Sequence, residues 1–203
     1  MKLFSERFYQ DRENFHLYLH KYNKHCNNIF ATLYYSRLKY LCKRVLNYIE
    51  NFAEWNDNKT GYDDCILLYY WIYITLAKYF GSNNIISMNH AFDCIERIWS
   101  NLVNYYKEKS YYEKCKPLFK EIVNHDDWKM RQELYDYYVD FTKLFDTDKL
   151  YDKVCKDYYK KIEEKIPLYV HFKQICSDNI SPNSMINIRI IILIQYYISY
   201  HAI

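Results

Sequence analysis

The chain has 203 residues and a formal net charge of +3, from 28 Lys and Arg against 25 Asp and Glu. Its only 2 glycines, Gly61 and Gly81, lie too far apart for a phosphate-binding loop, a Rossmann fingerprint or a nucleophile elbow. Basic and acidic residues are interspersed, so no concentrated basic face indicates a nucleic-acid partner.

Along most of the chain, apolar residues recur at steps of three and four, which is the spacing of amphipathic helices. The first clear stripe predicts a helix over residues 33–52, with these residues facing inward: Leu33, Leu38, Leu41, Val45, Ile49 and Phe52. The polar run 56–61 then indicates a turn, after which Asp63 and Asp64 can cap the next helix.

Residues 65–80 form that next predicted helix, which is apolar nearly all round. Its unbroken apolar run is shorter than the roughly twenty residues that span a bilayer, so we expect a central buried helix. Gly81 supplies its stop signal. Trp71 in this helix and Trp99 in the following one are expected to anchor the core.

A second apolar stripe predicts a helix over 88–106, and the polar stretch 107–127 is expected to be irregular. Two aspartates at the end of that stretch can cap a helix over 128–145, and Asp146 and Asp148 are expected to open the next helix. No alternating run predicts a strand. The predicted fold class is therefore all-α, a single irregular bundle of about six to eight helices.

The last part of the chain differs in composition, because residues 180–203 are rich in Ile and contain no acidic residue. We therefore expect a helical domain over 1–179 and a divergent tail over 180–203. The apolar runs of the tail are too short to form a transmembrane helix. The first residues carry charges throughout and show no apolar stretch of a secretory signal peptide.

Seven cysteines are spread singly along the chain, and none belongs to a C-x-x-C pair, which excludes zinc ribbons and thioredoxin chemistry. Two explanations stay open at this point: long-range disulfides between helices, or buried thiols in a reducing compartment. The odd count leaves at least one thiol unpaired, and Cys94 is our candidate for it.

The remaining polar patterns predict no catalytic, cofactor-binding or metal site. Glu13, His16 and His20 could face one metal ion on a helix, but a single E-x-x-H motif supplies too few ligands. His25 precedes Cys26, yet adjacent residues on a helix do not face each other. We therefore expect no enzymatic activity and no cofactor.

Four sequence blocks carry a resemblance to a known family. They are CILLYYWIYITL at 65–76, FDCIERIW at 92–99, WKMRQELYDYYVDF at 128–141 and VCKDYYKKIEEKIPLYVHFKQICSDN at 154–179. In sequence, order and spacing these blocks resemble the Plasmodium interspersed repeat (PIR) variant antigens, particularly the vivax-type VIR proteins. The resemblance covers residues 26–179.

This resemblance implies an α-helical, non-enzymatic domain of a multigene variant antigen, exported to the infected red cell or displayed on it and associated with antigenic variation. Host-cell surface proteins, red-cell proteins and antibodies are the implied partners. The resemblance also favours disulfides among the cysteines at family-like positions, namely Cys26, Cys42, Cys65, Cys115, Cys155 and Cys176.

The chain also departs from the family pattern. Ile74 stands where members frequently have Asp, and the further cysteines and transmembrane helix that members often carry are absent after Asn179. We interpret the Ile-rich ending as the product of a shifted or truncated reading frame. Membrane attachment is expected for the family, but no transmembrane segment is predicted in this chain.

Competing functions follow from these patterns. The leading prediction is a variant antigen whose packing fixes the core, while the turns 56–62 and 81–87 and the stretch 107–127 contact host molecules or antibodies. The alternative is an intracellular helical adaptor in the host red cell, without surface exposure, that binds partner helices in a groove. A metal-binding helical enzyme is the third, and only the E-x-x-H motif favours it.

Overall fold

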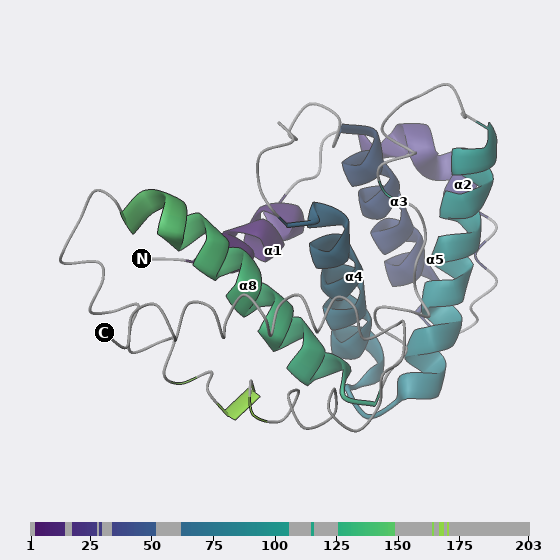
Figure 1. Ribbon diagram of the computed structural model, residues 1–203. Coiled ribbons are helices and arrows are strands. Elements are labelled where there is room, and N and C mark those ends of the chain that lie inside the picture. Colours follow the sequence, from purple (N-terminus) through teal and green to yellow (C-terminus); the bar gives the residue numbers. More distant parts are fainter. Residues whose placement is uncertain are drawn as a thin grey trace, which may run out of the picture. The chain divides into compact units, whose positions relative to one another are not determined.

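The computed structural model describes residues 3–14, 18–27, 29, 34–51, 62–105, 115, 126–148, 164, 167–168 and 170. Over these ranges it contains six α-helices, one short 3-10 helix and no strand, which confirms the predicted all-α class (Figure 1). The elements are α1 (Phe4–Asn14), η1 (Leu19–Tyr22), α2 (Asn23–Cys26), α3 (Tyr35–Asn51), α4 (Asp64–Phe80), α5 (Ile85–Tyr105) and α8 (Trp128–Asp148).

The chain divides into two compact units. The first comprises Glu6–Asp126, and the second comprises Met1–Ser5 together with Asp127–Ile203. The predicted domain boundary at residue 179 and the predicted tail 180–203 lie outside the described residues, so both stay predictions.

Helix α4 is the buried centre of the Glu6–Asp126 unit, as its apolar sequence predicts, and Trp71 within it is 1% exposed. At its start, the Asp63 carboxylate accepts a hydrogen bond from the Cys65 backbone N–H at 2.8 Å, so the predicted cap is confirmed. At its end, Gly81 has a φ of 86° and its N–H donates to the Ala77 carbonyl at 2.9 Å. The predicted stop signal is therefore also confirmed.

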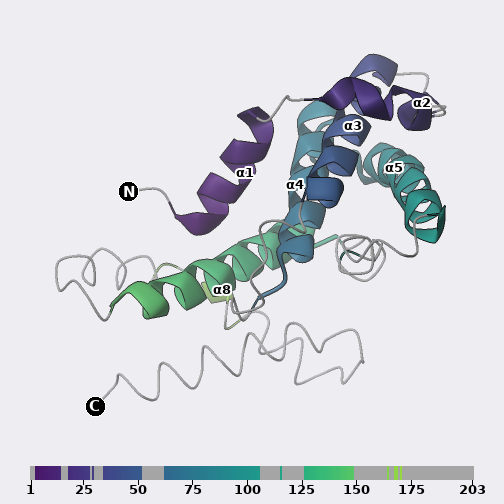
Figure 2. The ribbon, with the colours of Figure 1, turned by 90° about the horizontal axis from the view of Figure 1, so that it is seen from above.

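Helices α3, α4 and α5 lie side by side, which Figures 1 and 2 show from two directions. The predicted stripes supply the apolar faces, and these residues have no exposed surface: Leu38, Leu41, Val45, Ile49, Met88, Phe92, Ile95 and Trp99. The Tyr69 ring of α4 stacks on two rings of α5, with centroids 5.9 Å from Phe92 and 5.3 Å from Trp99. The contact between α4 and α5 is therefore largely aromatic.

Tyr73 of α4 is buried in this core, and its hydroxyl group is hydrogen-bonded. The Tyr73 side chain has no exposed surface, and its hydroxyl donates to the Asn89 side-chain carbonyl at 2.5 Å. Burial raises the pKa of the Tyr73 phenol to about 12, and the negative charge of Asp126 adds to the effect. A buried tyrosine is tolerated here because α5 provides the acceptor.

Helix α8 begins where the sequence predicts and ends later. The Asp127 carbonyl accepts hydrogen bonds from the Met130 and Arg131 N–H groups, and its carboxylate pairs with Arg131 Nε at 2.6 Å. The predicted boundary before Asp146 is wrong, because α8 continues to Asp148. Residues 146–148 include no glycine or proline, which would interrupt the helix. The backbone hydrogen bonds of α8 therefore continue past Phe145.

A buried carboxylate stabilises the unit that contains α8. Asp140 is 5% exposed, and its two oxygens accept from Ser5, one from the backbone N–H at 2.8 Å and one from the hydroxyl at 2.6 Å. Both hydrogen bonds are charge-assisted, so they compensate for the loss of water around the aspartate.

Candidate functional site

The structure describes two of the three residues of the E-x-x-H motif that was weighed as a metal site. Glu13 is exposed on α1 and forms an ion pair with Lys78 of α4, and His20 is exposed on η1. His16 lies outside the described residues. Within the described ranges, no three His, Cys, Asp or Glu side chains are arranged to hold a metal ion.

Two disulfides join elements of the Glu6–Asp126 unit. Cys26 at the end of α2 bonds to Cys42 in α3, with Cα atoms 6.0 Å apart. Cys65 at the start of α4 bonds to Cys115, with Cα atoms 5.4 Å apart. All four cysteines are buried, whereas Cys94 of α5 is half-buried and carries a free thiol.

The disulfides bear on two further sequence predictions. Because Cys26 is bonded to Cys42, the neighbouring His25 has no thiol to activate, so this pair is not a nucleophilic site. The expected disulfide cysteines Cys155 and Cys176 lie outside the described residues, and their pairing stays a prediction.

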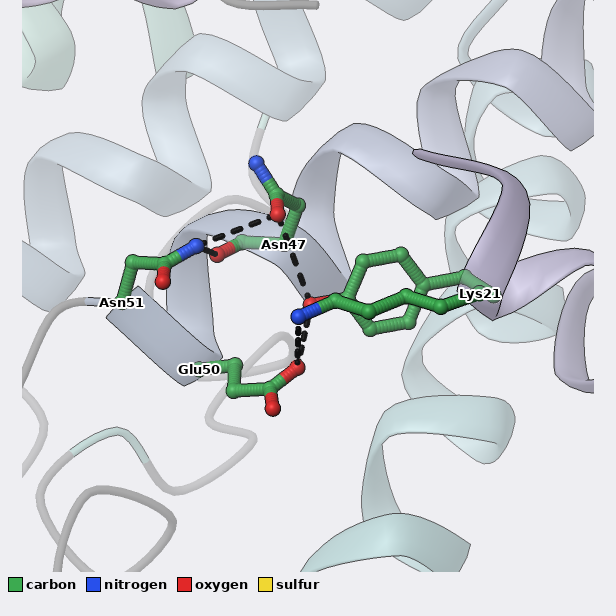
Figure 3. A network of polar contacts seen from close by, with 5 residues as sticks. Lys21, Asn47, Glu50 and Asn51 are labelled. Atoms are coloured by element: carbon green, nitrogen blue, oxygen red, sulfur yellow. Dashed lines mark hydrogen bonds and ion pairs between the residues drawn. The ribbon is translucent and has the colours of Figure 1, made fainter. Parts of the chain in front are cut away.

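A polar network fastens η1 to the last turns of α3, as Figure 3 shows. The Glu50 carboxylate forms an ion pair with Lys21 Nζ at 2.9 Å. It also accepts a hydrogen bond from the hydroxyl of the buried Tyr22. That hydroxyl lies 3.5 Å from Asn47 Oδ1, and Asn51 Nδ2 donates to both Asn47 oxygens at 2.7 and 3.1 Å. Together with Cys26–Cys42, this network holds the η1–α2 segment on α3 at two points.

The start of α3 and the end of α4 form a surface of arginines and tyrosines. Tyr34, Tyr35 and Tyr40 are 37%, 41% and 37% exposed. The exposed Arg37 places its guanidinium carbon 5.5 Å from the Tyr34 ring centre and 5.8 Å from that of Tyr79. We call these residues, with the Arg44 side chain beneath them, the Arg37 face.

Arg44 is a buried cation at the base of the Arg37 face. It is 8% exposed, and its guanidinium carbon lies 4.8 Å from the Trp71 ring centre and 5.6 Å from that of Tyr40. Burial lowers the pKa of the guanidinium, although the charge of Glu13 is among the opposing effects. Among the described residues, no acceptor pairs with its Nε or Nη2 atom.

Of the predicted contact regions, the structure describes 81–87, of which residues 81–84 form the turn and 85–87 are the first residues of α5. Ile86 is 76% exposed, Asn83 and Asn84 are also exposed, and the Asn84 side chain accepts a hydrogen bond from the Ser87 N–H at 3.3 Å. Most of 56–62 and of 107–127 lies outside the described residues. The turn therefore presents side chains that contribute little to the core.

Sequence reasoning missed both the network at Glu50 and the Arg37 face. One signal for the face was available, because Arg37, Tyr40 and Arg44 are spaced at three and four residues and so share one side of a helix. No comparable signal pairs Lys21 with Glu50, because their contact depends on how η1 lies against α3.

No helix in the described part of the chain is long and apolar enough to cross a bilayer. A family model described as "Plasmodium vivax Vir protein" matches residues 3–188, which confirms the resemblance seen in the four sequence blocks. Comparison with curated proteins and with solved structures finds no match.

Proposed function

We propose a host-facing, non-enzymatic role for this chain, which belongs to the Plasmodium vivax Vir protein family. Membership indicates a variant antigen of Plasmodium. The observation that carries the proposal is the extent of the family match, over residues 3–188. The protein is exported to the infected red cell or displayed on it, takes part in antigenic variation, and contacts host-cell or red-cell proteins and antibodies.

The division between a fixed core and free turns supports this proposal. Antigenic variation requires surface positions that can change without unfolding the protein. The aromatic contact between α4 and α5 is fully buried at Tyr69 and Trp99, whereas Ile86 at the start of α5, just after the turn 81–84, is 76% exposed. Substitutions in such a turn typically change stability by no more than about 0.5 kcal/mol.

The two disulfides also support display rather than the adaptor alternative. Disulfides form and persist in oxidising environments, whereas cytosolic thiols are kept reduced. An intracellular adaptor would need Cys26, Cys42, Cys65 and Cys115 as free thiols in a folded protein. The buried cross-links are instead suited to a domain that meets the exterior of the host cell.

Accessibility on intact infected cells tests the location. Antibodies raised against the oxidised chain are applied to live cells, to permeabilised cells and to live cells pretreated with trypsin. We expect labelling of live cells that trypsin removes. Labelling that appears only after permeabilisation would refute display and would favour the intracellular adaptor.

A matched pair of variants tests the contact role of the turn 81–87. Ile86→Ser removes an exposed apolar side chain from the part of this region that begins α5, and Val170→Ser removes one that is 47% exposed elsewhere. We expect the first variant, but not the second, to lose binding to host cells and to antibodies selected on the parent. Equal effects of the two variants would contradict a specific role for the turn.

A further inference from the structure

The first ten residues of α3 carry four basic and no acidic residues, a local departure from the otherwise interspersed charges of the chain. This segment, Tyr35–Arg44, contains Arg37, Lys39, Lys43 and Arg44 and no acidic residue. Arg37 lies in the first turn, where a positive charge opposes the helix dipole. None of the four cations forms an ion pair with a described residue. Stabilisation of the helix therefore does not explain this arrangement.

Arg44 is the buried member of these four cations, and one edge of its guanidinium has no hydrogen-bond acceptor among the described residues. Nε and Nη2 lie on one edge of a guanidinium, and that edge matches the two oxygens of a carboxylate. In Arg44 neither of these atoms has an acceptor among the described residues, whereas Arg131 donates its Nε to Asp127. Arg12 Nε also has no described acceptor, although its Nη1 atom donates to the Phe8 carbonyl. A buried charge with no anionic partner is unfavourable for folding, and among the described residues Arg44 has ring contacts but no ion pair.

Exposed aromatic rings surround these cations. Tyr34 has a φ of 64°, a left-handed conformation that is uncommon for a residue with a large side chain. Its ring is held in that position by an edge contact with Phe80, with centroids 5.2 Å apart, and by the Arg37 guanidinium. Tyrosine and arginine are the residue types enriched where protein interfaces gain most of their binding energy.

We propose that the Arg37 face binds an acidic segment of a partner protein. Carboxylates of the segment pair with Arg37, and its backbone and side chains pack on the exposed rings of Tyr34 and Tyr40. The charge of Arg44, just behind the Tyr40 ring, adds to the attraction. Because the face adjoins the turn that follows Phe80, the inference rests on the proposed contact function and specifies its partner as acidic.

Binding of a defined probe tests this proposal on the oxidised full-length chain. Fluorescent poly-L-glutamate is titrated with the parent, with Arg37→Gln and with Arg97→Gln, which removes an exposed arginine from α5 instead. We expect Arg37→Gln to weaken binding about tenfold and the control to weaken it less than about twofold, because only the first loses a contact. Equal losses, or no binding by the parent, would overturn the proposal.

Arg44→Met separates binding from folding. We expect its melting temperature to equal or exceed that of the parent, since a buried unpaired charge is replaced by an apolar side chain, while probe affinity falls. A lower melting temperature with unchanged affinity would show that Arg44 is structural and would overturn its part in binding. Tighter binding of polyphosphate than of poly-L-glutamate would refute the acidic protein segment as the ligand.

The outcome is independent of the location test. Probe binding that fails while live infected cells are labelled would overturn this inference and leave the host-facing role intact. Probe binding that depends on Arg37 in a protein found only inside permeabilised cells would overturn the host-facing role and leave the acidic-ligand surface intact.

Discussion

Removing the Cys65–Cys115 disulfide should destabilise the protein more than removing Cys26–Cys42. The reason is loop length, because the bridges close loops with sequence separations of 50 and 16 residues. The entropy that each cross-link removes from the unfolded chain corresponds to about 4 kcal/mol for the longer loop and about 3 kcal/mol for the shorter one. The loops do not overlap in sequence, so the removal of both bridges should cost about 7 kcal/mol.

Urea denaturation of oxidised protein measures this order. The variants are Cys26→Ala with Cys42→Ala, and Cys65→Ala with Cys115→Ala. Cys94→Ala is the matched control, because it deletes a half-buried thiol that closes no loop and should cost less than about 1 kcal/mol. A reversed order, or two double variants as stable as the control, would refute the entropic reasoning.

Three further predictions concern single residues of α4 and its ends. Asp63→Ala should lower the free energy of unfolding in urea by about 1 kcal/mol, whereas Asp63→Asn, which keeps the cap acceptor, should leave it unchanged. Equal losses in the two variants would argue against the cap. Gly81→Ala should cost about 1–2 kcal/mol through its φ of 86° alone, since no described atom beyond its chain neighbours lies within 4 Å of an added Cβ, and a variant as stable as the parent would contradict this. The pKa of Tyr73, about 12, lies above that of an unfolded tyrosine, so the unfolded chain releases its proton first and stability falls as pH rises from 10 toward 12. Tyr73→Phe should show a smaller loss of stability between pH 10 and pH 12, and an unchanged loss would exclude Tyr73 as its source.

The helices could be predicted from sequence because their causes are local. The spacing of Leu38 and Ile49 records which side of α3 faces inward, and Asp63 and Gly81 act on backbone groups only a few residues away. The error at Asp146 has the same origin. An aspartate is compatible with a helix cap and with a last turn, and nothing in its immediate neighbourhood distinguishes the two.

The candidate contact surface was less predictable. The exposed turn 81–84 follows from the stop signal at Gly81 and the polar residues after it, and Ile86 is exposed just beyond that turn, at the start of α5. The Arg37 face required knowledge that Arg44 is buried, and burial of a cation runs against its expected preference for the surface. It depends on the aromatic rings of Trp71 and Tyr40, which come from two different helices.

The amino-acid sequence by itself determined the all-α class, the buried central helix, the signals at both ends of that helix and the family to which the chain belongs. The tertiary structure alone decided that Cys26 pairs with Cys42 and Cys65 with Cys115, that Lys21 reaches Glu50, and that Arg44 is buried with no carboxylate partner among the described residues. The physical reason is the distance along the chain over which each kind of interaction acts. Helix periodicity and capping act over a few residues, whereas cross-links, ion pairs and burial depend on which helices lie side by side, and the packing of the whole core sets that arrangement.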